Sequence, residues 1–135
     1  DIETVSGNAV SYPMIGDSDL KVAKLYDMLP AGEASGEGRT AATNQTVRTV
    51  FVIGPDKKVK LSLTYPMTTG RNFDEILRAL DSIQLTAKHK VATPAGWKQG
   101  EDVIITPAVS NEEAVEKFGE FETILPYLRK AKQPS

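Results

Sequence analysis

Two arginines occupy positions that suit them to bind an anion in the folded chain. Arg48 comes directly before the apolar run at 50–53, and Arg71 comes directly before Asn72, where a helical pattern begins. An arginine stays charged and offers forked donors to a phosphate, a carboxylate or a thiolate. The free N–H groups at a helix N-terminus attract the same anions. These residues therefore predict an anion site, with two surface arginines paired to carboxylates such as Asp74 as the alternative.

A predicted β-hairpin positions the first of these arginines. Residues 49–53 are β-branched apart from Phe51, which is typical of a strand covered on both faces. Gly-Pro-Asp at 54–56 indicates a turn. Residues 59–65 then alternate apolar and polar side chains, which favours an edge strand with one buried face. That edge, with Leu61, Leu63 and Tyr65 on its apolar face, is also a predicted contact with a second subunit.

The hairpin geometry brings the predicted site residues together. The start of the first strand and the end of the second lie at the same end of an antiparallel hairpin, so we expect Arg48 near Tyr65. Arg71 follows Tyr65 by six residues and is within reach of that end. It precedes Asn72, an N-cap residue with Glu75 three positions later, as in a capping box. Two guanidinium groups and a helix N-terminus are therefore expected to converge.

Further elements follow from the same patterns. We expect a strand at 10–15, a turn and helix cap at 16–18, and a helix that presents Val22, Leu25, Tyr26 and Leu29 to the core before Pro30 ends it. A long loop is predicted at 31–46, and the helix after Asn72 has an apolar stripe over 73–83. The segment beyond Thr86 reads as an appended element with a short strand at 103–106, a capped helix at 110–118 and Trp97 as its packing anchor.

Composition narrows the class of protein. The chain has 135 residues, of which 40% are hydrophobic and 25% charged, as in an ordinary globular domain. Its net charge of −2 gives no basic field for nucleic acid or acidic lipid. We find neither an apolar run long enough for a transmembrane helix nor a signal-peptide pattern in the first residues. These features favour a soluble protein, cytoplasmic by default, with an organelle left open.

The chain contains no cysteine and a single histidine, His89. Disulfides, thiolate metal sites and cysteine nucleophiles are therefore excluded within these residues, and no metal or other cofactor is predicted. His89 lies among lysines and is expected to be a solvated residue. Asp56 is a candidate acid of a hydrolytic triad, although a turn residue after Gly-Pro is the simpler interpretation.

Two stretches of the sequence are identifiable. The run VRTVFVIGPDKKVKLSLTYPMTTGRNFDEILRALDSIQLT at 47–86, followed by KVATPAGWKQGEDVIITP at 90–107, closely resembles the peroxiredoxin family. Within that family it is similar to the one-cysteine, peroxiredoxin 6-like subfamily. The upstream YPMIGDSDLKVAKLYDML at 12–29 resembles the strand and helix that precede the hairpin there.

The resemblance implies an α/β architecture, the C-terminal part of a thioredoxin-like fold over 1–87 and a C-terminal, dimer-associated extension over 88–135. It implies a thiol peroxidase that reduces hydrogen peroxide and organic hydroperoxides through a cysteine that leaves as sulfenic acid. Arg48 matches the family arginine that lowers the thiolate pKa and orients the peroxide, and Arg71 matches a second arginine near that pocket. A thiol reductant such as glutathione or thioredoxin, or else ascorbate, and a homodimer joined edge strand to edge strand are the implied partners.

The sequence departs from the family pattern in one large respect. The family nucleophile lies in a Pro-x-x-x-Thr-x-x-Cys motif that these residues do not contain, so we expect a fragment whose cysteine lies upstream. Some relatives of this type are credited with phospholipase A2 activity, and Asp56 matches the acid of that proposal. Such a hydrolase activity of the intact protein and an inactive dimerisation fragment are the two alternatives.

Overall fold

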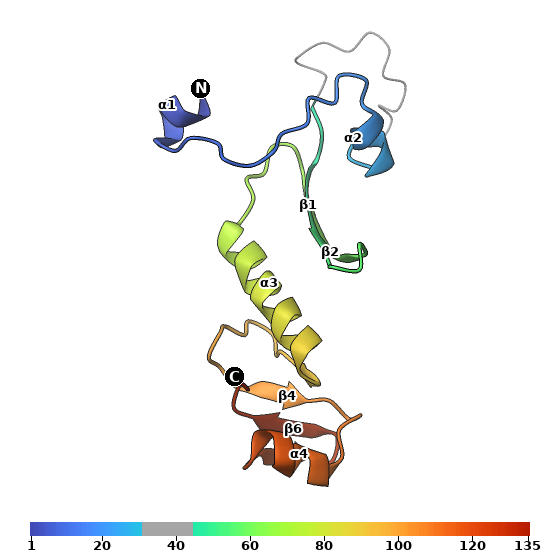
Figure 1. Ribbon diagram of the computed structural model, residues 1–135, viewed down its shortest axis with the longest axis vertical. Helices are drawn as coiled ribbons and strands as arrows, with labels where there is room; N and C mark the ends of the chain where they lie inside the picture. The colour runs from blue at the N-terminus through green and yellow to red at the C-terminus, as the bar shows by residue number, and fades with distance from the viewer. Residues whose placement is uncertain (31–44) are drawn as a thin grey trace. The chain divides into compact units, whose positions relative to one another are not determined.

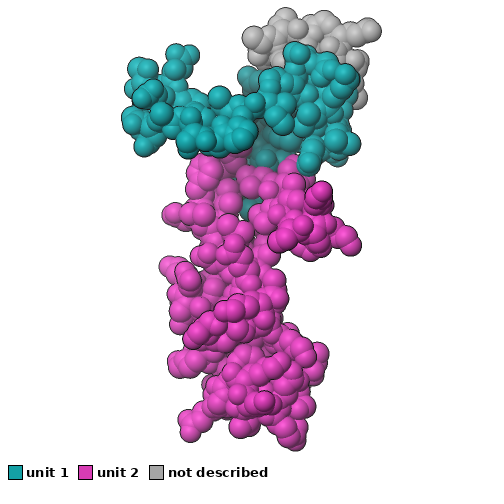
Figure 2. Space-filling view, viewed as in Figure 1, with its two compact units in different colours: residues 1–49, 63–70 teal, residues 50–62, 71–135 magenta. Residues whose placement is uncertain are grey.

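The computed structural model describes residues 1–30 and 45–135. They form two compact units, one of residues 1–49 and 63–70 and the other of residues 50–62 and 71–135 (Figure 2). The long loop predicted at 31–46 falls almost entirely outside the described residues.

The first unit begins with the short helix α1 (Ile2–Ser6), after which residues 7–20 are without regular structure. The strand predicted at 10–15 is wrong. Pro13 has no N–H to donate, and no described strand pairs with this segment, so its backbone lacks the ladder that a strand needs. Met14 and Ile15 are exposed instead of packed.

Helix α2 (Lys21–Leu25) is shorter than predicted. The Asp17 carboxylate accepts hydrogen bonds from the backbone N–H groups of Val22 and Ala23 at 2.9 and 2.8 Å, so the predicted turn does cap the helix. The predicted core face is wrong, because Leu25 is 80% exposed while Ala23 is buried. The helix is only five residues long and ends at Leu25, so the 3.6-residue pattern never completes two turns.

The predicted hairpin is confirmed. Strands β1 (Arg48–Ile53) and β2 (Val59–Tyr65) form a two-stranded sheet (Figure 1). The Oγ1 atoms of Thr49 and Thr64 are hydrogen-bonded at 3.2 Å across the strands. From Leu61 onward, half-buried and exposed residues alternate along β2 as predicted. β1 was expected to be buried on both faces. In the described part of the chain it is not, because every residue of the strand is half-buried or exposed.

Helix α3 (Phe73–Lys88) begins as predicted, because the Asn72 side chain accepts a hydrogen bond from the Glu75 N–H at 3.2 Å. Its apolar stripe is not covered by the described residues. Phe73 and Leu77 are 64% and 58% exposed, and no residue of α3 is buried. The amphipathic pattern thus forms the helix although the described residues provide only a partial partner surface for it.

The C-terminal residues form a second, better packed sheet of four antiparallel strands in the order β3-β4-β6-β5. Its members are β3 (Val91–Ala92), β4 (Val103–Ile105), β5 (Glu122–Leu125) and β6 (Leu128–Ala131). Helix α4 (Asn111–Phe118) packs on it through Ala114, which is fully buried against Ile105 (Figure 1). The predicted strand at 103–106 and the capped helix are confirmed, whereas sequence reasoning missed β3, β5 and β6.

The core of this sheet confirms the predicted role of Trp97. The indole is 1% exposed, packs with Val91 and Val103, and donates from Nε1 to the Glu101 carbonyl at 3.1 Å. Buried Trp needs such a partner for its N–H. The appended segment therefore has a core of its own.

Candidate anion site

Arg48 is the first residue of β1 and is half-buried. Its Nη1 donates to the Thr46 carbonyl at 3.4 Å, which is a long bond for an N–H donor. Among the described residues no carboxylate forms an ion pair with it. The Thr49–Thr64 bond ties the start of β1 to the end of β2, which is where Arg48 and Tyr65 lie. Arg48 thus keeps most of its donors available for an anion.

Arg71 is exposed and immediately precedes the N-cap of α3. Its guanidinium carbon lies 6.0 Å from the ring centroid of Phe73, within range of a cation–π contact. The alternative pairing with Asp74 is not present. Arg48 and Arg71 belong to different units, so their convergence stays a prediction.

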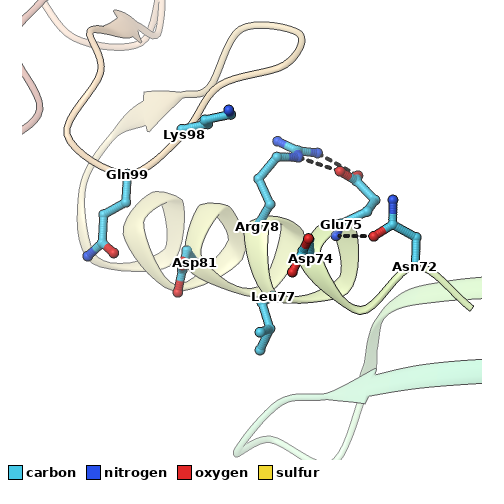
Figure 3. A pocket seen from close by; sticks show the side chains of 8 residues that line it. All are labelled: Asn72, Asp74, Glu75, Leu77, Arg78, Asp81, Lys98 and Gln99. Atoms are coloured by element: carbon cyan, nitrogen blue, oxygen red, sulfur yellow. Dashed lines mark hydrogen bonds and ion pairs between the residues drawn. The ribbon is translucent and has the colours of Figure 1, made fainter.

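A cavity of about 470 Å³ lies along the first half of α3 (Figure 3). Arg78 lines this cavity and donates two hydrogen bonds to the Glu75 carboxylate, from Nε at 2.6 Å and from Nη2 at 2.7 Å. The pair lowers the pKa of the Glu75 carboxyl through those hydrogen bonds. Arg78 Nη1 also donates to the Trp97 carbonyl at 3.2 Å. Its charge therefore ties α3 to the loop around Trp97, and we assign it a structural role.

Sequence reasoning missed this link. The spacing of three residues between Glu75 and Arg78 places them on one helix face and could have predicted their ion pair. Nothing in the sequence pattern predicts the contact of Arg78 with Trp97, 19 residues later. No cluster of His, Cys, Asp and Glu suited to a metal occurs in residues 1–30 and 45–135.

Asp56 lies in the turn between β1 and β2. Its Oδ2 accepts from Lys60 Nζ at 2.8 Å and its Oδ1 from the Lys58 N–H at 3.3 Å. The hydrogen bond from Lys60 is the main reason that the pKa of Asp56 is lowered. These contacts are those of a turn residue, and they leave its role as a hydrolytic acid a prediction.

The proposed contact residues Leu61, Leu63 and Tyr65 are all half-buried and share one face of β2. In the described part of the chain β2 pairs with β1 alone, so its other edge is open. None of the helices in that part is both long and apolar enough to cross a membrane.

Comparisons with known proteins place this arrangement in a family. A family model described as the C-terminal domain of 1-Cys peroxiredoxin matches residues 82–120. Peroxiredoxin PRX1, mitochondrial, of Saccharomyces cerevisiae is 51% identical over 89% of the chain, and Peroxiredoxin-6 of Rattus norvegicus is 47% identical over 99% of it. The chain belongs to the one-cysteine peroxiredoxin family.

Solved structures of this peroxiredoxin family agree with the model. A yeast mitochondrial 1-Cys peroxiredoxin superposes with a TM-score of 0.85 at 48% identity, over 97% of this chain and 61% of that one. A cysteine-to-serine mutant of the peroxiredoxin 6 of Arenicola marina superposes with a TM-score of 0.86 at 45% identity, over 99% of this chain and 62% of that one. The predicted fold class, an α/β part of the peroxiredoxin fold, is confirmed.

The chain covers only part of its relatives. It spans 45% of the length of the Saccharomyces cerevisiae protein and 62% of that of the Rattus norvegicus protein. With no cysteine in its sequence, this peroxiredoxin chain lacks the residue after which its family is named.

Proposed function

We propose that this chain supplies the cationic side of a thiol peroxidase site in a longer one-cysteine peroxiredoxin, with Arg48 and Arg71 as its contribution. The observation that carries the proposal is the identity of about half of its residues to proteins named 1-Cys peroxiredoxins. The available donors of Arg48 at the start of β1 support it. We further propose residues 1–87 as part of the thioredoxin-like domain and 88–135 as its extension.

The chemistry follows from charge. A cysteine thiolate attacks one oxygen of the peroxide, the O–O bond breaks, and the second oxygen leaves with the electron pair and takes up a proton. Sulfur is oxidised to sulfenic acid, and the peroxide is reduced to an alcohol or water. A guanidinium beside the sulfur favours the thiolate over the thiol and stabilises the negative charge that develops on the leaving oxygen.

Two thiols of a reductant return the sulfenic acid to the thiol, releasing water and forming a disulfide. One structural neighbour is described as resolving its thiol through the glutathione and thioredoxin systems. We therefore propose a thiol reductant for this protein, and comparing turnover with glutathione, thioredoxin and ascorbate would identify it.

The test is Arg48→Ala in the longer protein. We expect a loss of about 10² to 10³-fold in the rate of peroxide reduction, by analogy with removal of one oxyanion donor, together with a raised pKa of the reactive thiol. Lys58→Ala removes a cation from the exposed hairpin turn and is the matched control. Equal rates and equal thiol pKa values in the two variants would refute the role of Arg48.

We propose a homodimer that forms through the open edge of β2. A lysine at Leu63 places charge on the apolar face, whereas Ser62→Lys places it on the exposed face of the same strand and is the control. Light scattering should show a monomer for Leu63→Lys and a dimer for Ser62→Lys. A dimer of unchanged mass in both variants means that the interface lies elsewhere.

The remaining predictions have simpler tests. Phospholipid hydrolysis by the longer protein before and after Asp56→Asn decides the hydrolase alternative, and equal activity dismisses Asp56. If the longer protein neither reduces peroxide nor cleaves lipid, the inactive dimerisation module is the remaining alternative.

We also propose a cytoplasmic location. Because one relative is named as mitochondrial, cell fractionation that separates cytosol from mitochondria is the test.

A further inference from the structure

A second cationic region lies in the C-terminal unit, away from the residues assigned above. A cavity of about 540 Å³ opens there between the end of α3, α4 and the last residues of the chain. Its lining includes one aromatic side chain, the histidine and four lysines, namely Phe118, His89, Lys88, Lys90, Lys117 and Lys132. None of its lining residues is acidic. The volume is within the range of small-molecule sites.

The carboxylates near this cavity do not balance the lysines. Glu113 Oε1 is shared by Lys90 at 3.2 Å and Lys117 at 2.6 Å. Asp102 is likewise shared by Lys130 at 3.2 Å and Lys132 at 2.9 Å. Each carboxylate thus faces two ammonium groups, so two positive charges are left over. Lys88 donates to the carbonyl of Ser135 at 2.9 Å and forms no ion pair with a described carboxylate.

The histidine is the second, independent observation. His89 was expected to be solvated, but this expectation is wrong, since its ring is half-buried and Nε2 is buried with no hydrogen-bond partner among the described residues. A buried polar atom without a partner is rare in folded proteins. The ring borders this cavity and a neighbouring one, so a ligand bound there would lie beside the ring.

We propose that this cavity binds a small polyanion that carries phosphate groups. Lysine ammonium groups bind phosphate as point charges, and a cleft lined by one sign of charge concentrates the opposite ion. Phe118 offers an apolar wall for the body of the ligand. The proposal does not depend on the peroxidase site, because no residue of that site lines the cavity.

The experiment uses the 135-residue chain and inorganic pyrophosphate. His89 is its only histidine, so the histidine ring resonances in a proton NMR spectrum are assigned to it directly. Titration at fixed pH should give a saturable shift of those resonances. Sodium chloride at equal ionic strength should not reproduce it. A shift that fails to saturate, or that chloride matches, overturns the proposal.

A matched pair of variants makes the test specific. Lys130 and Lys132 both pair with Asp102, but only Lys132 lines the cavity. Lys132→Gln should weaken pyrophosphate binding about threefold to fivefold, as expected for one exposed charge, while Lys130→Gln should leave it unchanged. Both side chains are at least 42% exposed, so we expect both variants to fold, with unchanged Trp97 fluorescence as the check. Equal affinities in the two variants contradict the site.

Discussion

Strands β1 and β4 are both short runs of β-branched residues, yet they end in different surroundings. In β4, Val103 and Ile105 are completely buried, because β3 and β6 flank the strand and α4 packs on it. In β1, the sole described neighbour is β2, and Ile53 is 50% exposed. The C-terminal sheet therefore buries its apolar residues against elements of its own unit. The apolar residues of the hairpin, in contrast, have no complete packing partner among the described residues.

Two arginines show the same contrast. Arg129 in β6 is 6% exposed and donates to Asn111 Oδ1, the Thr106 carbonyl and the Val109 carbonyl at 2.8, 3.1 and 2.6 Å. Arg48 in β1 makes one long side-chain hydrogen bond within residues 1–30 and 45–135. A buried cation that donates three hydrogen bonds holds structure together, while a cation that makes one long bond is suited to a ligand. This is our physical reason for placing the anion site at the hairpin.

The largest expected effect comes from the two strands. Ile105→Ala should lower the free energy of unfolding by about 2–5 kcal/mol, because it leaves a cavity in a closed core. Ile53→Ala should cost less than about 1 kcal/mol, since its side chain is already half in water. Chemical denaturation followed by far-ultraviolet circular dichroism, to which both regions contribute, measures both. Similar losses in the two variants would break the comparison.

The two arginines give the next largest effect. Arg129→Met removes three hydrogen bonds and leaves the buried Val109 carbonyl without this donor, so we expect a loss of about 1–3 kcal/mol in the free energy of unfolding. Arg48→Met in the same chain should change it by no more than about 0.5 kcal/mol. The same denaturation assay by circular dichroism applies. A large loss on replacing Arg48 would mean that its role is structural.

Acid should produce a smaller effect, to which two carboxylates of the C-terminal sheet region contribute. Lys117 and Lys90 lower the pKa of Glu113, and Lys132 and Lys130 lower that of Asp102, mainly by hydrogen bonding. A carboxyl with a lowered pKa stabilises the fold above its usual value, 4.5 for Glu113 and 3.8 for Asp102, and loses that contribution as the pH falls further.

The midpoint of Trp97-monitored unfolding should therefore decline below these pH values, and Asp102→Asn should make the decline shallower. Asp56→Asn is the control, because Asp56 is also paired with a lysine but lies in the hairpin turn. An equally shallow decline in that variant would show that the two regions unfold together.

The sequence predicted the elements whose signals are local. The Asn72 and Ser110 caps, the alternation in β2 and the turn at Asp56 each depend on neighbours within a few residues, and all appear in the structure. The pairing of β6 with both β4 and β5 depends on contacts far along the chain, and ETIL and LRKA have no clear alternation. Burial failed for the same reason, since periodicity shows which face is apolar and not what covers it.

The sequence predicted which residue types form the candidate site, namely two arginines, but could not show their distance in space. Arg48 and Arg71 stand out because a cation before an apolar strand or a helix start is unusual. The basic cavity was not foreseen, because Lys88, Lys117 and Lys132 come from three separate segments that only the fold brings together.

Hydrogen exchange of the backbone amides in the 135-residue chain tests the central claim most directly. If the C-terminal sheet is complete and the hairpin is not, amides of β4 and β6 should exchange slowly while those of β1 and β2 exchange quickly. Equally slow exchange in both sheets would show that the hairpin needs no further cover, and the account would be contradicted.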